Sequence, residues 1–164
     1  AYTEEKTMRK AQREITDPAA LAALLGRGRV INLALNADGA PYVVPMNYGC
    51  KDGVLYVHCA REGTKLDLLR ADARVGFSIV VDYALRLKDD ACEATAHYAS
   101  ICGTGTARIL ETPEEKLRGL EAVVAQVAPH AGREFPKKVL DVTCVVAITP
   151  ERLTGKQNPP PPAA

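Results

Sequence analysis

The stretch PYVVPMNYGCKDGVLYVHCAREGTKLDLL, residues 41–69, decides the fold that this sequence predicts. Two runs in which apolar and other residues alternate, 42–48 and 54–59, are joined across Lys51-Asp52-Gly53, and an Asp-Gly pair is typical of a hairpin turn. After Gly63-Thr64-Lys65, leucines recur at helical spacing. The stretch therefore predicts two antiparallel strands that lead directly into a helix.

The start of that helix has residues suited to binding a phosphate. Gly63 lets a ligand approach the backbone closely, Thr64 supplies a hydroxyl, and Lys65 supplies a positive charge beside the exposed N–H groups of the first turn. The sequence has no G-x-x-x-x-G-K-[ST] loop and no G-x-G-x-x-G unit between a strand and a helix. A phosphate bound here would therefore be held by another architecture, and the alternative interpretation is a capped helix with a solvated lysine.

The flanking segments predict a barrel of antiparallel strands. Asp17-Pro18 is a helix start, with the helix ending near Gly26, and Thr112-Pro113-Glu114-Glu115 starts a helix that runs to about Ala128. Further strands are predicted over 29–36, 74–81, 98–110 and 144–149, and a loop or mobile excursion over 82–96. Because most strands are joined by short turns, a mainly β fold, a β-barrel with peripheral helices, is favoured over a doubly wound parallel sheet.

Length, charge and composition restrict the class of protein. The 164 residues predict one domain, residues 1–158, followed by a proline-rich tail over 159–164. With 21 basic and 20 acidic residues the net charge is +1, so no overall field attracts nucleic acid or an acidic membrane. No apolar run reaches the roughly 20 residues that cross a bilayer, and the first residues are polar, so we expect a cytoplasmic protein.

The cysteines and histidines show no spacing typical of a metal site. Five cysteines without a C-x-x-C motif argue against a disulfide framework and against a zinc site, so reduced thiols are expected. Cys59, Cys102 and Cys144 lie in apolar strand-like runs and are predicted to be small buried side chains. His58, His97 and His130 are widely separated, and no metal is predicted.

Several motifs occur in an order that is more specific than any one of them: Met8-Arg9-Lys10, Arg13-Glu14-Ile15, Pro41 to Tyr48, Tyr56 to Ala60, Gly63-Thr64-Lys65, Tyr98 to Gly105 and Leu153 to Lys156. Together they resemble the FMN-binding split-barrel family related to pyridoxamine 5'-phosphate oxidase, and more closely its nitroimidazole-resistance, or Nim-like, branch. The resemblance implies a six-stranded antiparallel FMN-binding split barrel. It also implies a homodimer with FMN at the interface.

The resemblance assigns cofactor-binding roles to ten residues. Gly63, Thr64 and Lys65 match the segment that holds the flavin phosphate, although the family usually has a second basic residue where this chain has Thr64. Pro45, Met46, Asn47 and Tyr48 match the strand that lies along the isoalloxazine ring, and Ser100 matches a second strand that borders the flavin. Lys156 matches the segment that approaches the flavin across the dimer, and His58 matches a histidine near the flavin. The alternatives are a plain barrel strand for the first four and a hydroxyl bonded to neighbouring backbone for Ser100.

His58 is the candidate catalytic residue, because its imidazole can donate a proton to a substrate that is being reduced. The alternative is a histidine that only forms hydrogen bonds within the barrel. Gly155 and Lys156 match the segment near the flavin, but the chain lacks tryptophan and the C-terminal Arg-x-His pattern of true pyridoxamine phosphate oxidases. Oxidation of vitamin B6 is therefore not expected.

Three functions remain open after this comparison. The first is an FMN-dependent oxidoreductase that passes electrons to a small electron-poor acceptor such as a nitroimidazole or quinone, with Tyr48 or Tyr98 stacking near the ring. The second is a flavin- or haem-binding protein without turnover, used for storage, sensing or electron relay, in which His58 or His97 would ligate haem iron. The third is a cofactor-free barrel that binds other molecules.

Overall fold

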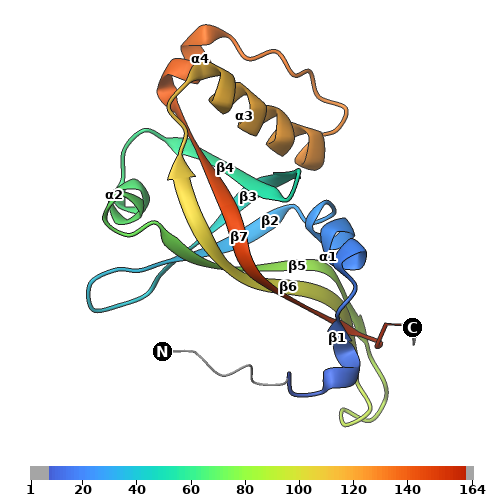
Figure 1. The fold of residues 1–164 in the computed structure, drawn as a ribbon. Coiled ribbons are helices and arrows are strands. Elements are labelled where there is room, and N and C mark those ends of the chain that lie inside the picture. The colour runs from blue at the N-terminus through green and yellow to red at the C-terminus, as the bar shows by residue number, and fades with distance from the viewer. Residues whose placement is uncertain (1–7, 162–164) are drawn as a thin grey trace.

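The computed structural model describes residues 8–161, and antiparallel strands form most of it (Figure 1). The chain order contains one short 3₁₀ helix, four α-helices and seven strands in the described part: η1 (Ala11–Arg13), β1 (Glu14–Ile15), α1 (Pro18–Leu25), β2 (Val30–Leu35), β3 (Tyr42–Lys51), β4 (Val54–Ala60), α2 (Thr64–Ala71), β5 (Arg74–Arg86), β6 (Thr95–Ile109), α3 (Pro113–Val127), α4 (Lys137–Val142) and β7 (Thr143–Asn158).

The strands close into a barrel. Their order is β1-β7-β4-β3-β2-β5-β6. Because β6, the last strand in this order, also pairs with β7, the sheet closes on itself. Strands β2 to β7 make the barrel, while β1 adds two residues beside β7. The expected six-stranded antiparallel barrel with helices around it is confirmed.

Alternation along the strands fills the barrel. In β2, Ile31, Leu33 and Leu35 are buried, and the residues between them are only partly covered. Since successive side chains of a strand point to opposite faces, one face of each strand supplies the core. Leu66 and Leu69 of α2 close the barrel near one end, as the leucine spacing predicts.

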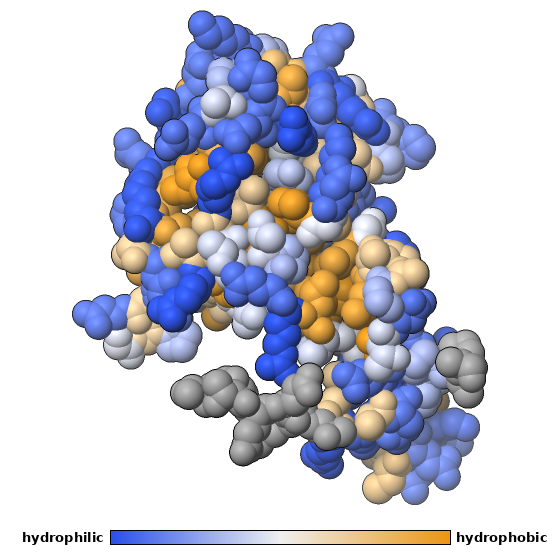
Figure 2. Space-filling view, viewed as in Figure 1, coloured by the Kyte–Doolittle hydropathy of each residue, from blue (hydrophilic) through white to orange (hydrophobic). Residues whose placement is uncertain are grey.

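Helix α3 covers the outer face of β3, β4 and β7 and builds a second apolar cluster there (Figure 1). Thr112 and Glu115 form the predicted capping box at its start. Its Gln126 side chain donates to the carbonyls of Leu25 and Gly28 and accepts from the Cys50 N–H at 2.8 Å. Hydrophilic side chains surround this α3–α4 end, whereas apolar patches lie nearer the middle of the same face (Figure 2).

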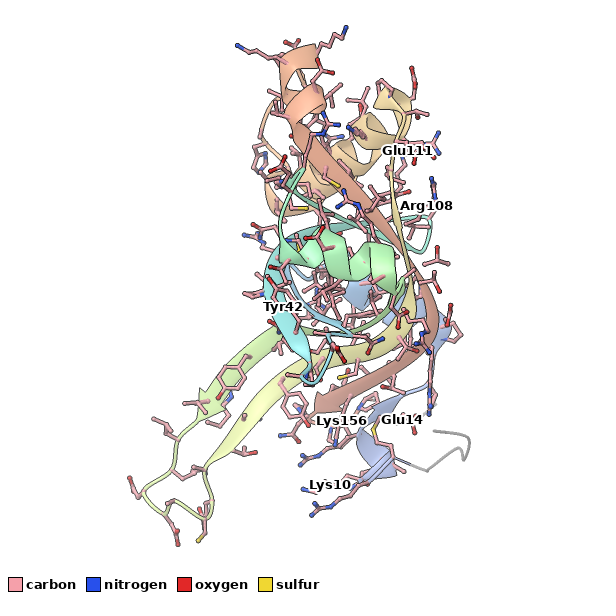
Figure 3. The ribbon with its side chains drawn as sticks, turned by 90° about the vertical axis from the view of Figure 1, so that its left-hand side faces the viewer. Lys10, Glu14, Tyr42, Arg108, Glu111 and Lys156 are labelled. Atoms are coloured by element: carbon pink, nitrogen blue, oxygen red, sulfur yellow. The ribbon has the colours of Figure 1, made fainter. Side chains whose placement is uncertain are left out.

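The predicted loop over 82–96 is wrong. After a bulge between Val80 and Asp82, β5 and β6 continue to pair as far as Arg86 and Thr95, which leaves residues 87–94 as the connection. This hairpin projects from the barrel (Figure 3). Both of its faces are largely exposed, so no burial pattern appears in the sequence, while backbone pairing needs none.

The last strand is longer than the predicted 144–149. β7 runs on through Pro150, which lies opposite Gly105 beside a register shift, to Asn158. An irregular pairing tolerates a residue without an N–H, and therefore the proline does not end the strand. β1 and α4 had no clear sequence signal. The domain boundary at 158 and the tail over 159–164 stay predictions, and residues 162–164 lie outside the described residues.

Burial of the three strand cysteines differs from one to the next. Cys144 is buried and Cys59 is half-buried, in line with the prediction, whereas Cys102 is exposed on the outside of the barrel, so the prediction is wrong for it. Its neighbours Ile101 and Gly103 make the run look apolar, but the alternation turns Cys102 outward. Within residues 8–161, no helix is both long and apolar enough to span a bilayer.

Candidate functional site

The turn before α2 leaves its first N–H groups open to a ligand. Gly63 precedes the helix with φ 125°, a conformation that favours glycine, and nothing lies within 4 Å of where a Cβ would be. No side chain of the described part caps this helix start. The exposed Thr64 and half-buried Lys65 follow at once, so an anion here would meet backbone donors and a positive charge.

His58 lies near the end of β4, close enough to Lys65 for the lysine charge to affect its pKa. Partial burial of the imidazole, and then the positive charge of Lys65, hold the pKa of His58 below its ordinary value. Both causes disfavour the imidazolium ion. The neutral imidazole, with one nitrogen that donates and one that accepts a hydrogen bond, is therefore favoured over the imidazolium.

An edge of β3 next to His58 lacks a partner strand. Pairing between β3 and β4 ends at Tyr48 and Val57, although β3 continues back to Tyr42 along β2. The Tyr48 N–H donates to the Arg29 carbonyl on the β2 side at 3.3 Å, so alternation turns the Asn47 N–H and C=O and the Pro45 C=O towards the open side. In the described residues no strand pairs with these groups, and they are free to bond a planar polar ligand.

Side chains of the same strand divide between the two faces. Tyr48 is 0% exposed and its hydroxyl donates to the Leu25 carbonyl at 2.7 Å, so the expected stacking of Tyr48 on a ligand ring is wrong. Met46 is half-buried against the core. Asn47 points outward, and its amide donates to the Arg29 carbonyl at 3.1 Å. Pro45 and Asn47 therefore supply the outward contacts of β3, and Met46 and Tyr48 support them from inside.

Ser100 and Lys156 form a second group, on β6 and β7. They lie opposite each other, and the Ser100 hydroxyl is 3.5 Å from the Lys156 carbonyl. The Lys156 ammonium is 3.5 Å from the Arg9 carbonyl, and Lys156 lies beside Glu14 of β1 (Figure 3). The alternative role of Ser100, a hydroxyl bonded to neighbouring backbone, agrees with this geometry.

The two groups do not meet within one chain. Between Asn47 on β3 and Ser100 on β6 lie β2 and β5, which corresponds to about 14 Å around the barrel at the usual strand spacing. Lys156 is one strand further in this direction, at about 19 Å. In the other direction β7 is only two strands from β3, but Lys156 lies eleven residues along β7 from Val145, the partner of His58, which is about 36 Å at the usual rise of a strand. A single ring that bonds the open edge of β3 is therefore out of reach of Lys156 of the same chain.

An uncharged outer face lies between the two groups, and sequence reasoning missed it. Three exposed valines, Val30, Val43 and Val80, are 45%, 60% and 54% exposed. Registered pairs join the residues between them into one row across five strands: Pro45, Asn32, Ser78, Cys102 and Thr154. We call these eight residues the valine face. The absence of charge at alternate positions of three successive strands was the available signal.

The start of α2, Lys65, His58 and the open edge of β3 form the first group, and these residues fit a flavin phosphate and ring. The start of α2 offers uncapped N–H groups and Lys65 to a phosphate, while the open edge of β3 offers a donor and acceptors to the polar edge of a planar ring. His97 lies elsewhere, on the projecting hairpin, where its Nδ1 accepts from Arg86 at 3.2 Å. Among residues 8–161, no three His, Cys, Asp or Glu side chains gather as metal ligands.

Comparison with known proteins gives a family and a fold. A family model described as pyridoxamine 5'-phosphate oxidase matches residues 17–157. No curated protein matches the chain. Many solved structures resemble it over most of its length, among them the following three.

A candidate 5-nitroimidazole antibiotic resistance protein from Bacteroides thetaiotaomicron has 22% identity and a TM-score of 0.76, covering 87% of this chain and 85% of its own. The FAD and heme binding protein from Mycobacterium smegmatis has 21% identity and a TM-score of 0.78, with coverages of 92% and 77%. The flavocytochrome Anf3 from Azotobacter vinelandii has 17% identity and a TM-score of 0.80, with coverages of 98% and 77%.

At these identities the solved structures establish the fold, while the family model extends over most of the chain, from the first helix through the last strand. The match includes the Gly63-Thr64-Lys65 turn, the open edge of β3, and both Ser100 and Lys156. This chain belongs to the pyridoxamine 5'-phosphate oxidase family.

Proposed function

We propose that this protein is an FMN-dependent oxidoreductase that passes electrons to a small, flat, electron-poor acceptor such as a nitroimidazole or quinone. The observation that carries the proposal is the position of the uncapped α2 start and Lys65 beside the unpaired edge of β3. Similarity to a candidate nitroimidazole resistance protein supports the Nim-like branch and this class of acceptor. The isoalloxazine of a bound flavin would supply the redox chemistry.

In this proposal, residues of the chain bind the flavin, orient its ring and supply a proton. Lys65 and the first N–H groups of α2 hold the phosphate, and the backbone of Pro45 and Asn47 bonds the polar edge of the ring. His58 lies next to this edge; its imidazole takes up a proton to form the imidazolium, which donates that proton to an acceptor atom as that atom gains negative charge and returns to the neutral form. Its lowered pKa makes the imidazolium a ready proton donor once it forms.

The site is completed by a second copy of the chain. Ser100 and Lys156 cannot reach the ring from their own chain, and the valine face that separates them from Asn47 is uncharged and exposes three valines. Packing of two such faces buries apolar surface and brings Ser100 and Lys156 of one copy towards the open edge of the other. The homodimer with FMN at its interface is therefore part of the proposal.

Val80→Asp is expected to dissociate the dimer. A carboxylate on the valine face loses its hydration when the two copies associate and gains no partner, which costs free energy. Because the dimer is two-fold symmetric, this desolvation cost arises once in each copy. The dimer dissociation constant should rise roughly 100-fold or more. Light scattering across a concentration series measures it, with Val142→Asp on α4, where the valine is 67% exposed, as the matched control. If both variants remain dimers as tight as the parent, this face is not the interface.

His58→Ala is expected to slow acceptor reduction by roughly 100-fold while flavin affinity changes little. Because the pKa of His58 lies below its ordinary value, the parent rate should rise as pH falls through that lowered pKa, and this rise should vanish in the variant. Stopped-flow reoxidation of the reduced protein by a nitroimidazole gives the rate at each pH. Equal rates and equal pH profiles would leave His58 with a structural role.

Similarity to an FAD and heme binding protein and to a flavocytochrome favours a second candidate, a flavin- or haem-binding protein without turnover. In that case His58 or His97 would be the axial ligand. The Nε2 of His97 is the nitrogen to consider, because its Nδ1 accepts from Arg86. Electron relay or storage would then replace reduction of a small acceptor.

The absorbance spectrum of the purified protein, followed by mass identification of the chromophore released on unfolding, separates these candidates. A two-band yellow spectrum with released FMN supports the oxidoreductase, provided that a nicotinamide donor bleaches the flavin and an acceptor restores its colour. Bleaching without recovery by acceptors indicates a carrier. An intense haem band moves the assignment to the second candidate, and a colourless protein that refuses added flavin overturns both.

A further inference from the structure

Two of the cysteines face each other across a strand pair. Cys59 of β4 and Cys144 of β7 are directly opposite in the antiparallel register. The Leu110 N–H donates to the Val145 carbonyl on the β6 side, so alternation turns the backbone groups of Cys144 towards β4, and the pair is of the hydrogen-bonded kind. Cα atoms in such a pair lie about 5.5 Å apart, within the range that a disulfide spans.

The two side chains lie on the same side of the sheet, at the barrel core. Cys144, at 6% exposure, belongs to the barrel core cluster and half-buried Cys59 packs against it, near enough for the Cys144 thiol to raise the pKa of Cys59. The remaining cysteines have no such partner among the described residues. Cys50 lies opposite Leu55, Cys102 lies between Ser78 and Thr154, and Cys92 is on the exposed hairpin connection.

One cysteine of the pair lines a cavity from which a small oxidant would approach. Cys144 lines a cavity of about 240 Å³ whose rim includes Arg61, Arg70 and Lys116 against one carboxylate, Glu111. On the other side, the charge of Lys65 favours the thiolate of Cys59, although burial dominates and raises the pKa of that thiol. Positive surroundings and partial access are typical of thiols that can be oxidised, whereas burial makes the reaction slow.

We propose that Cys59 and Cys144 form a redox modification site, in which a hydroperoxide converts the two thiols into a reversible disulfide. The Cys59 thiolate attacks one peroxide oxygen, the O–O bond breaks, and Cys59 becomes a sulfenic acid while water or an alcohol leaves after protonation. The Cys144 sulfur then attacks the Cys59 sulfur, the S–O bond breaks and water leaves. Two thiols lose two electrons and two protons in total, and the peroxide gains them.

The disulfide ties the end of β4 to β7 just before the turn that leads into α2. Because it closes a long loop of chain, the cross-link should restrict the unfolded state more than the folded one. The proposal does not depend on flavin binding, so it can fail while the proposed function holds. It also agrees with reduced thiols as the resting form, because a thiol reductant reverses the modification.

The test uses the full chain and a variant that keeps only this pair, Cys50→Ser, Cys92→Ser and Cys102→Ser. After treatment with hydrogen peroxide and alkylation of remaining thiols, we expect a monomer mass lower by two hydrogens, a linked peptide containing residues 59 and 144, and full reversal by dithiothreitol. The melting temperature of the oxidised form should rise by roughly 10 °C. Adding Cys144→Ser should abolish the linked peptide.

The proposal is overturned if the two residues remain alkylatable after peroxide, if Cys59 carries only sulfinic or sulfonic acid, or if linked peptides join different chains. Circular dichroism of the reduced variant establishes that the three serines leave it folded. If they do not, peptide mapping of the parent chain carries the test, because the 59–144 linkage is identified there directly.

Discussion

Replacement of Gly49 by valine is expected to lower the free energy of unfolding by about 4 kcal/mol. Gly49 lies on β3 where α3 crosses, and an added Cβ would run into the backbone of Ala122 and Val123. Backbone cannot move aside as a flexible side chain does, so α3 must shift as a whole. The shift would also weaken the hydrogen bonds that Gln126 makes with the Cys50 N–H and two carbonyls.

Thermal unfolding followed by circular dichroism measures this effect, and a fall of about 12 °C in melting temperature is expected for a chain of this size. Gly132→Val is the matched control, because Gly132 follows α3 in open space, where an added Cβ would have nothing within 4 Å. If the Gly49 variant has the same melting temperature as the control, α3 does not pack against β3 as closely as described.

Lys65→Ala is expected to weaken FMN binding roughly 10- to 100-fold, the loss of one charge-assisted contact to phosphate. If the proposed FMN site is right, Lys65 is the main side-chain charge for the phosphate at this helix start, because its neighbour Thr64 is neutral. The helix should persist, since alanine is a strong helix former and Leu66 and Leu69 still anchor it in the core.

Titration with two ligands makes this test specific. Riboflavin lacks the phosphate, so its affinity should be equal in the parent and the variant, while FMN affinity should fall only in the variant. Lys51→Ala, an exposed lysine at the end of β3, is the control for a general loss of positive charge. An equal loss for both ligands would place Lys65 away from the phosphate, and no loss for either would remove it from the site.

Local patterns in the sequence were sufficient for most of the elements around the site. The Asp17 cap and the Thr112–Glu115 box determine where α1 and α3 begin, because these side chains bond the first free N–H groups of their own helices. Alternation in β2, β3 and β4 and the leucines of α2 mark which side chains turn inward. Such signals involve residues a few positions apart, so they do not depend on how distant parts of the chain pack.

Features without a burial pattern were not predictable in this way. The hairpin of β5 and β6 is exposed on both faces, and the end of β7 passes a proline, so neither reads as a strand until its partner is known. Tyr48 looks like a ring that stacks on a ligand. Its place in the core depends on the Leu25 carbonyl that it meets, which is supplied by α1.

The sequence by itself determined the barrel strands, the helix starts and the Gly63-Thr64-Lys65 turn, since each depends on alternation, capping or backbone freedom within a short segment. Only the tertiary structure decided that β4 leaves β3 after Tyr48 and opens an edge beside His58, that Cys59 meets Cys144, and that Ser100 and Lys156 lie too far around the barrel to join that edge. These relations depend on register between distant strands, and register follows from the packing of the whole core.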